Sequence, residues 1–290
     1  GIGRKLVAKA IEALKAEQIN KVYLIAFTRN EGGNAFWKKV GWQCQDDRNY
    51  YDLNLNEANM TVLSESKWWQ EQEYSEGAVT ASKGFKASSA AAGIKYQGRT
   101  DMAMIYSDVP CVAAGTFTTN IVKAAPVKWD RQVVYESEHA QAVICNSGIA
   151  NACTGVQGMA YCEATAAKAA EVLGVQKDAV LVASTGVIGM QLKMDRIEAG
   201  IDMLAPALDG SIDAGHLAAK AIMTTDTVPK EVAVTFEIGG KKVTMGGMCK
   251  GSGMIHPNMC TMLGFITTDA NISKALLQEA LSEDIKDTYN

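Results

Sequence analysis

The chain has 290 residues, of which 48% are hydrophobic, so it can bury a sizeable core in one or two domains. A formal net charge of −4 and a pI near 5.5 argue against the basic surface that nucleic-acid-binding proteins carry. The seven cysteines form no CxxC pair and no apolar run could span a bilayer, so we expect a cytoplasmic protein without a disulfide framework, zinc ribbon or membrane anchor.

The first 59 residues carry patterns typical of two helices and two strands. Apolar residues three and four apart predict the first helix, and Asn34 is a suitable N-cap for the second. In chain order we predict a helix over 4–19, a strand over 21–27, a helix over 34–40 and a strand over 50–55. A polar run precedes Met60, and we place a domain boundary there, dividing the chain into segments 1–59 and 60–290.

In the second segment, strand-like runs alternate with Ala-rich helices. Strands are predicted over residues 102–106, 112–117, 142–145, 179–183, 231–238, 241–245 and 262–266. Helices are predicted over residues 159–173, 195–204, 214–223 and 273–289. Gly239 and Gly240 supply a hairpin turn between two of the strands. This mixture of elements predicts the α/β class, with mixed α+β layers.

The start of the chain has the features of a phosphate-binding turn. Gly1 and Gly3 open a predicted helix, whose N-terminus favours an anion. The order of elements that follows, with Asn34 and the run FWKKVGW, resembles the second half of the GNAT acetyltransferase family. The resemblance implies that Gly1, Gly3 and Asn34 contact coenzyme A. The family's earlier part is absent from the chain, so we expect segment 1–59 to be inactive by itself.

An enzyme built on the second segment needs a base other than histidine. The chain has three histidines, no GxSxG elbow and no HExxH, so we expect neither a serine triad nor a metal site. An α-amino group freed at a new N-terminus titrates near neutral pH and is one candidate base. The glycine-rich stretch 246–270 contains Lys250 and Thr261. Composition alone favours a different interpretation, a glycine loop with a solvated Lys250 that leads into a core strand.

The run KGSGMIHPNMCTML, residues 250–263, resembles the signature of the ornithine acetyltransferase (glutamate N-acetyltransferase) family. The resemblance implies self-cleavage between Cys260 and Thr261, which makes Thr261 an N-terminal nucleophile. Cys260 stands where the family pattern has Ala. Further runs match in the family's order: GFKASSAAAGIK (84–95), AAGTFTTNIVKAAPV (113–127), NSGIANACTG (146–155), STGVIG (184–189) and MTTDTVPK (223–230).

The resemblance also implies a fold, a reaction and a set of site residues. The fold would be the N-terminal-nucleophile fold of ArgJ- and DmpA-like enzymes, with an α chain over 60–260 and a β chain starting at Thr261. Thr185 and Gly186 would form the oxyanion hole, and Thr224, Lys250 and Thr261 would contact substrate, with Thr225 as an alternative to its neighbour. The enzyme would move acetyl from N-acetylornithine to glutamate through acetyl-Thr261.

The implied enzyme needs no cofactor and assembles as a heterotetramer of two α and two β chains. Whether acetyl-CoA also serves as an acetyl donor stays open. Two other functions remain open as well. One is a self-processing aminopeptidase of the same fold, and the other is a catalytically inactive fusion in which segment 1–59 is a docking module.

Overall fold

The structure is a computed structural model that describes residues 73–75, 77–252, 259, 262–285 and 288. The chain divides into two compact units, Gly1–Val62 and Leu63–Asn290, and the described residues all belong to the second. The elements predicted over 4–55 lie outside the described residues, as do Gly1, Gly3 and Asn34. The domain boundary at Met60 and the GNAT resemblance therefore stay predictions.

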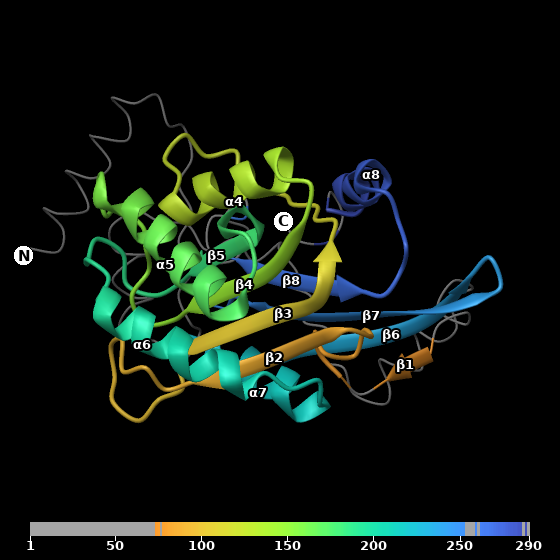
Figure 1. The fold of residues 1–290 in the computed structure, drawn as a ribbon, viewed down its shortest axis with the longest axis horizontal. Helices are drawn as coiled ribbons and strands as arrows, with labels where there is room; N and C mark the ends of the chain where they lie inside the picture. The colour runs from red at the N-terminus through yellow and green to blue at the C-terminus, as the bar shows by residue number, and fades with distance from the viewer. Residues whose placement is uncertain (1–72, 76, 253–258, 260–261, 286–287, 289–290) are drawn as a thin grey trace, which may run out of the picture. The chain divides into compact units, whose positions relative to one another are not determined.

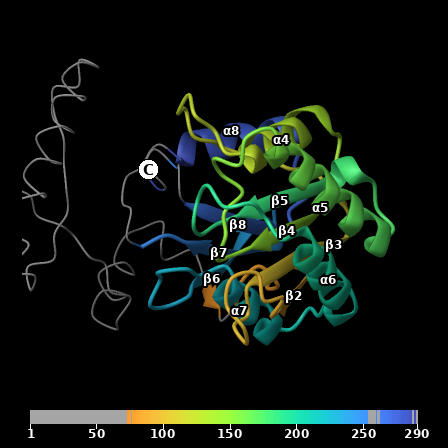
Figure 2. The same cartoon turned by 90° about the vertical axis from the view of Figure 1, so that its left-hand side faces the viewer.

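One four-stranded sheet forms the centre of the second unit. It has the order β2 (Phe85–Ala90), β3 (Met102–Cys111), β4 (Ala140–Asn146) and β5 (Val180–Ser184), and only the β4–β5 pair is parallel. Helices α4 (Ala125–Glu136), α5 (Gln157–Leu173) and α6 (Met194–Leu204) lie on one side of it (Figures 1 and 2). Buried residues of α5 and α6 form one core with alternate residues of the strands, including Met102, Met104, Ile144 and Val182.

A second sheet lies against the opposite face of the first. Its order is β1 (Glu73–Ser75), β6 (Lys230–Ile238), β7 (Lys241–Lys250) and β8 (Leu263–Thr268), all antiparallel. The remaining strand residues of the first sheet, such as Ala103 and Ile105, pack with Met248 of β7 and with helix α7 (Ile212–Ala221). A Cβ at Gly246 would lie 2.0 Å from the carbonyl oxygen of Ala78, so only glycine permits this approach.

The free edge of β5 is covered by α4. Trp129 Nε1 donates to the carbonyl oxygen of Val180 (2.9 Å), and Asp130 Oδ1 accepts from the backbone N–H of Val182 (2.8 Å). These side chains satisfy backbone groups that have no neighbouring strand on that side of the sheet. Helix α8 (Lys274–Asp284) follows β8, with Ser273 as its N-cap.

The prediction of mixed strands and helices is confirmed, with two local corrections. Residues 112–117 form no strand, because Gly115 pairs its N–H and carbonyl with the side chain of Gln278 (3.0 and 3.2 Å). Strand β7 continues to Lys250, so Gly246 and Gly247 belong to a strand and not to a loop. On β6, Ala233 and Thr235 are the buried residues.

Candidate active site

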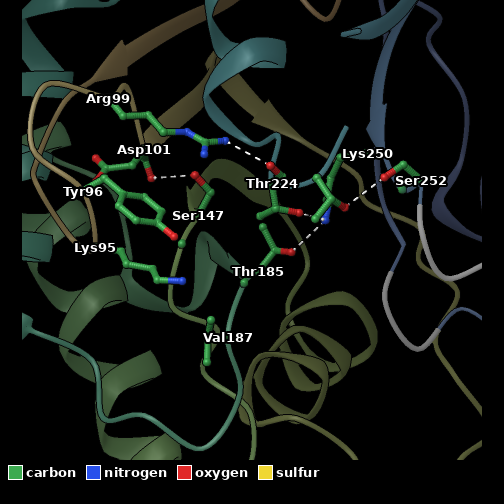
Figure 3. Close-up of a pocket in the computed structure, with 14 residues that line it drawn as sticks. Lys95, Tyr96, Arg99, Asp101, Ser147, Thr185, Val187, Thr224, Lys250 and Ser252 are labelled. Carbon is green, nitrogen blue, oxygen red and sulfur yellow. Dashed lines mark hydrogen bonds between the residues drawn. The ribbon is translucent and has the colours of Figure 1, made fainter. Parts of the chain in front are cut away.

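A pocket of about 370 Å³ lies where several chain segments end (Figure 3). The parallel strands β4 and β5 contribute the residues that follow their carboxyl ends, which is where ligands bind in many α/β folds. The loop before β3, the turn after α7 and the end of β7 complete the walls. The lining residues are Lys95, Tyr96, Arg99, Asp101, Ser147, Gly148, Thr185, Gly186, Val187, Thr224, Thr225, Lys250, Gly251 and Ser252.

Lys250 is the central cation of this pocket. Its side chain is directed inward at the last position of β7, and the residue is only 6% exposed. Nζ donates to Thr185 Oγ1 (3.0 Å) and to Thr224 Oγ1 (2.7 Å), as Figure 3 shows. Burial lowers the pKa of Lys250, while the negative charge of Asp226 opposes that shift. The alternative of a solvated Lys250 is therefore wrong.

Gly186 adopts a backbone conformation that this corner requires. Its φ is +130°, and a Cβ there would lie 2.3 Å from the carbonyl carbon of Gly148. The two segments are joined by backbone hydrogen bonds, from Thr185 N to Asn146 O (2.9 Å) and from Val187 N to Gly148 O (3.1 Å). The residues after β4 and β5 therefore fit together closely only because residue 186 is a glycine.

The loop before β3 is shaped by Asp101, which is buried. Its carboxylate accepts from the backbone N–H groups of Ala92 (2.8 Å) and Ile94 (2.7 Å). This holds the following residues against the pocket, where Lys95 Nζ lies 4.8 Å from the ring centroid of Tyr96. From the same loop, an Nη of Arg99 donates to the carbonyl oxygen of Met223 (2.7 Å).

Hydrogen bonds join the turn after α7 to the end of β7 and the residues that follow it. Thr225 Oγ1 lies 2.9 Å from Ser252 Oγ, beside the contact between Thr224 and Lys250. Asp226 accepts from the backbone N–H of Gly251 at 2.9 Å. Three consecutive residues of the turn thus contact three consecutive residues, 250–252.

The structure brings together four of the predicted site residues: Thr185, Gly186, Thr224 and Lys250. Lys250 contacts Thr224, and the alternative Thr225 instead pairs with Ser252. Cys260 and Thr261 lie outside the described residues, so their cleavage stays a prediction.

Sequence reasoning missed several residues of this site: Lys95, Tyr96, Arg99, Asp101 and Asp226. Three of them lie inside or next to the motifs GFKASSAAAGIK and MTTDTVPK, which gave the only available signal. Within the described part of the chain, no three His, Cys, Asp or Glu side chains are grouped as metal ligands, and no helix is long and apolar enough to cross a membrane.

Solved structures share this fold. ArgJ from Bacillus halodurans is 41% identical, with a TM-score of 0.62 over 66% of this chain and 98% of that one. Ornithine acetyltransferase from Mycobacterium tuberculosis, solved in complex with ornithine, is 42% identical, with a TM-score of 0.60 over 66% of this chain and 100% of that one. They place the chain in the mixed α/β fold class that the sequence predicts.

The ArgJ family's sequence model matches residues 86–290, and the chain belongs to that family. The arginine biosynthesis bifunctional protein ArgJ of Symbiobacterium thermophilum is 54% identical over 220 residues, covering 75% of this chain and 54% of the relative. ArgJ 1 of Clostridium acetobutylicum is 53% identical over 206 residues, covering 71% and 50%. The chain thus spans about half the length of the curated relatives it matches.

Proposed function

We propose that the whole protein is an acyltransferase that moves acetyl from N-acetylornithine to glutamate through acetyl-Thr261. The observation that carries the proposal is the hydrogen-bonded group of Lys250, Thr185 and Thr224 beside Gly186. Membership of the ArgJ family and the likeness to an ornithine acetyltransferase in complex with ornithine support the choice of substrates.

The charges of the pocket favour substrates that carry carboxylates. Its described lining contains three cations, Lys95, Arg99 and Lys250, and one carboxylate, that of Asp101. Both oxygens of Asp101 accept backbone N–H groups, so this carboxylate pairs with none of the three cations. A buried ammonium such as Lys250 is suited to an α-carboxylate, which both N-acetylornithine and glutamate possess.

Lys250 also determines what the two threonine hydroxyls can do. An ammonium only donates hydrogen bonds, so Thr185 Oγ1 and Thr224 Oγ1 must both act as acceptors toward it. Each hydroxyl therefore keeps its own hydrogen for another acceptor. At Thr185, which lines the pocket beside Gly186, this hydrogen is available to an oxyanion.

The reaction follows in two steps. Thr261 Oγ attacks the acetyl carbonyl while its freed α-amine takes the hydroxyl proton. Thr185 and the Gly186 N–H stabilise the oxyanion until the C–N bond breaks and ornithine leaves with the proton. The amine of glutamate then attacks acetyl-Thr261, and N-acetylglutamate is released with Thr261 restored.

The proposal includes cleavage between Cys260 and Thr261 and assembly of two α and two β chains. It requires no cofactor for the exchange, and acetyl-CoA is a second donor for direct acetylation of glutamate, which fits the word bifunctional in the relatives' names. Segment 1–59, which resembles part of a GNAT acetyltransferase, is not needed for this exchange. A protein that starts at Met60 and folds should keep the exchange, and its loss would contradict this assignment.

The decisive experiment changes Thr261 in the whole protein. Thr261→Ala should abolish both cleavage, read by denaturing gels and mass spectrometry, and acetyl exchange between ornithine and glutamate. Thr261→Ser keeps a hydroxyl and should retain part of each. Normal cleavage and exchange in Thr261→Ala would remove the proposal, and peptide hydrolysis without acetyl exchange in the unaltered protein would favour an aminopeptidase instead.

A further inference from the structure

Asp226 is a buried carboxylate that the reaction steps above do not use. Its side chain is 1% exposed and comes from the turn between α7 and β6. Oδ1 accepts from Lys230 Nζ (2.7 Å) and from the backbone N–H of Gly251 (2.9 Å), and Oδ2 accepts from the backbone N–H of Thr224 (3.3 Å). One carboxylate therefore holds the backbone at Thr224 and at the residue directly after Lys250.

We propose that Asp226 is the positioning residue of this site, holding Thr224 and Lys250 in register so that Lys250 can bind a substrate carboxylate. The inference deepens the proposed function and rests on it. Residues 224 and 250 are 26 positions apart and belong to different elements, so their side-chain contact depends on what joins the two backbones. The carboxylate of Asp226 makes a direct hydrogen bond to each segment.

The charge of Asp226 acts on Lys250 as well. Burial works to raise the pKa of Asp226, but hydrogen bonds from Lys230, Gly251 and Thr224 hold it below its usual range, so the group is ionised at neutral pH. Burial lowers the pKa of Lys250, and the positive charge of Lys230 lowers it further. The negative charge of Asp226 raises it. Cys145 also faces Lys250, but burial raises its thiol pKa to about 12, which leaves it uncharged at neutral pH.

Asp226 thus favours the charged form of Lys250 without forming a hydrogen bond to it. Among the described residues, its hydrogen bonds go to Lys230, Gly251 and Thr224, and those of the Lys250 ammonium go to two hydroxyls. The ionised carboxylate of Asp226 stabilises the ammonium form of Lys250 by charge attraction, without a hydrogen bond between them. The ammonium remains able to bind an incoming carboxylate.

The test measures the Lys250 amine directly in the whole protein. Lysine labelling by an amine-reactive reagent is followed across pH by mass spectrometry, in the unaltered protein, Asp226→Asn and Lys230→Met. Asp226→Asn should move half-maximal labelling of Lys250 to lower pH, because the supporting negative charge is gone. Lys230→Met should move it to higher pH, because a repelling cation is gone.

Kinetics give the second readout. Asp226→Asn should raise KM for N-acetylornithine about tenfold, the factor expected when one charged hydrogen bond to substrate is weakened. Asp108→Asn is the matched control, since Asp108 pairs with Lys86 at the same 2.7 Å but both side chains are exposed, and it should change neither readout. If Asp226→Asn does not fold, Asp226→Glu takes its place: the charge stays, but the longer side chain displaces the contacts with Thr224 and Gly251, so KM should still rise.

An unchanged labelling midpoint with an unchanged KM in Asp226→Asn overturns the inference, as does an equal effect of Asp108→Asn. An unchanged KM in Asp226→Glu, where that variant decides alone, also overturns it. Labelling needs no catalysis, so the two proposals fail separately. If Thr261→Ala retains acetyl exchange, the reaction is wrong, while the labelling midpoints still judge whether Asp226 supports Lys250.

Discussion

Removing the Thr185 hydroxyl tests the oxyanion role most directly. Thr185→Val replaces the hydroxyl with a methyl group of similar size, so this residue, which is 8% exposed, keeps its shape but loses its polar group. Lys250 keeps its contact with Thr224 Oγ1 at 2.7 Å but loses the one to Thr185 at 3.0 Å. The cost in folding free energy should be about 1–3 kcal/mol, the range for leaving a buried donor partly unsatisfied.

The catalytic effect should be larger than the effect on stability. One oxyanion donor contributes about 3 kcal/mol to the transition state, so kcat for acetyl exchange should fall on the order of a hundredfold or more. KM should change little, because the oxyanion exists only in the transition state. Thr224→Val should show the opposite division, with a raised KM and a smaller fall in kcat, because Thr224 contacts substrate in the proposed function.

A buried threonine outside the pocket provides the control. Thr165 lies in α5, is 3% exposed, and donates from Oγ1 to the carbonyl oxygen of Tyr161 (2.7 Å). Thr165→Val removes a buried hydroxyl without touching the site, so kcat should stay at its original value. Steady-state kinetics and urea unfolding of the three variants separate catalysis from stability. An unchanged kcat in Thr185→Val would refute the oxyanion assignment.

Two further predictions concern folding. Gly186→Ala should prevent correct folding of the pocket corner and abolish exchange, because its Cβ would lie 2.3 Å from the carbonyl carbon of Gly148; a soluble, active Gly186→Ala protein would contradict this. Burial raises the pKa of Asp130 from 3.8 to about 8, so as pH rises from about 4 the unfolded state loses this proton first and the folded state becomes less stable. Asp130→Asn still accepts from Val182 and does not titrate, so its stability relative to the unaltered protein should grow with pH, by at most about 1.4 kcal/mol per unit, until about pH 8. Urea unfolding at pH 5, 6 and 7 measures the trend, and a pH-independent difference would count against it.

Much of the fold was predictable because the periodicity of apolar residues and the residue preferences of turns are local properties of the sequence. The hairpin of β6 and β7, with Gly239 and Gly240 between them, follows from alternation and glycine alone. Residues 112–117 show where this fails: Gly115 forms its backbone hydrogen bonds with Gln278, which lies 163 residues away. No local pattern contains that partner, so an apolar run there looked like a strand.

The site divides in the same way. Family motifs indicated Thr185, Gly186, Thr224 and Lys250, and the structure brings these four residues together. The burial of Lys250 was also accessible from the sequence, since Gly246, Met248 and Lys250 share one face if the strand is extended far enough. A family motif contains Asp226, but the roles of Asp226 and Arg99 could not be predicted, because they depend on contacts with Gly251 and Met223 that only the tertiary fold creates.

The partners of Lys250 point to what the pocket is built to receive. Taking an ammonium out of water is costly unless an opposite charge or several hydrogen bonds compensate. Within the described part of the chain, the ammonium of Lys250 donates to two neutral hydroxyls, and the nearby carboxylate of Asp226 is directed to Lys230, Gly251 and Thr224. Because an ammonium has three donors, the described contacts leave one for a further acceptor. A substrate carboxylate would complete both the charge balance and the hydrogen bonds. Burial of Lys250 therefore lowers the free energy of unfolding of the free protein, and binding of an anionic substrate offsets that loss.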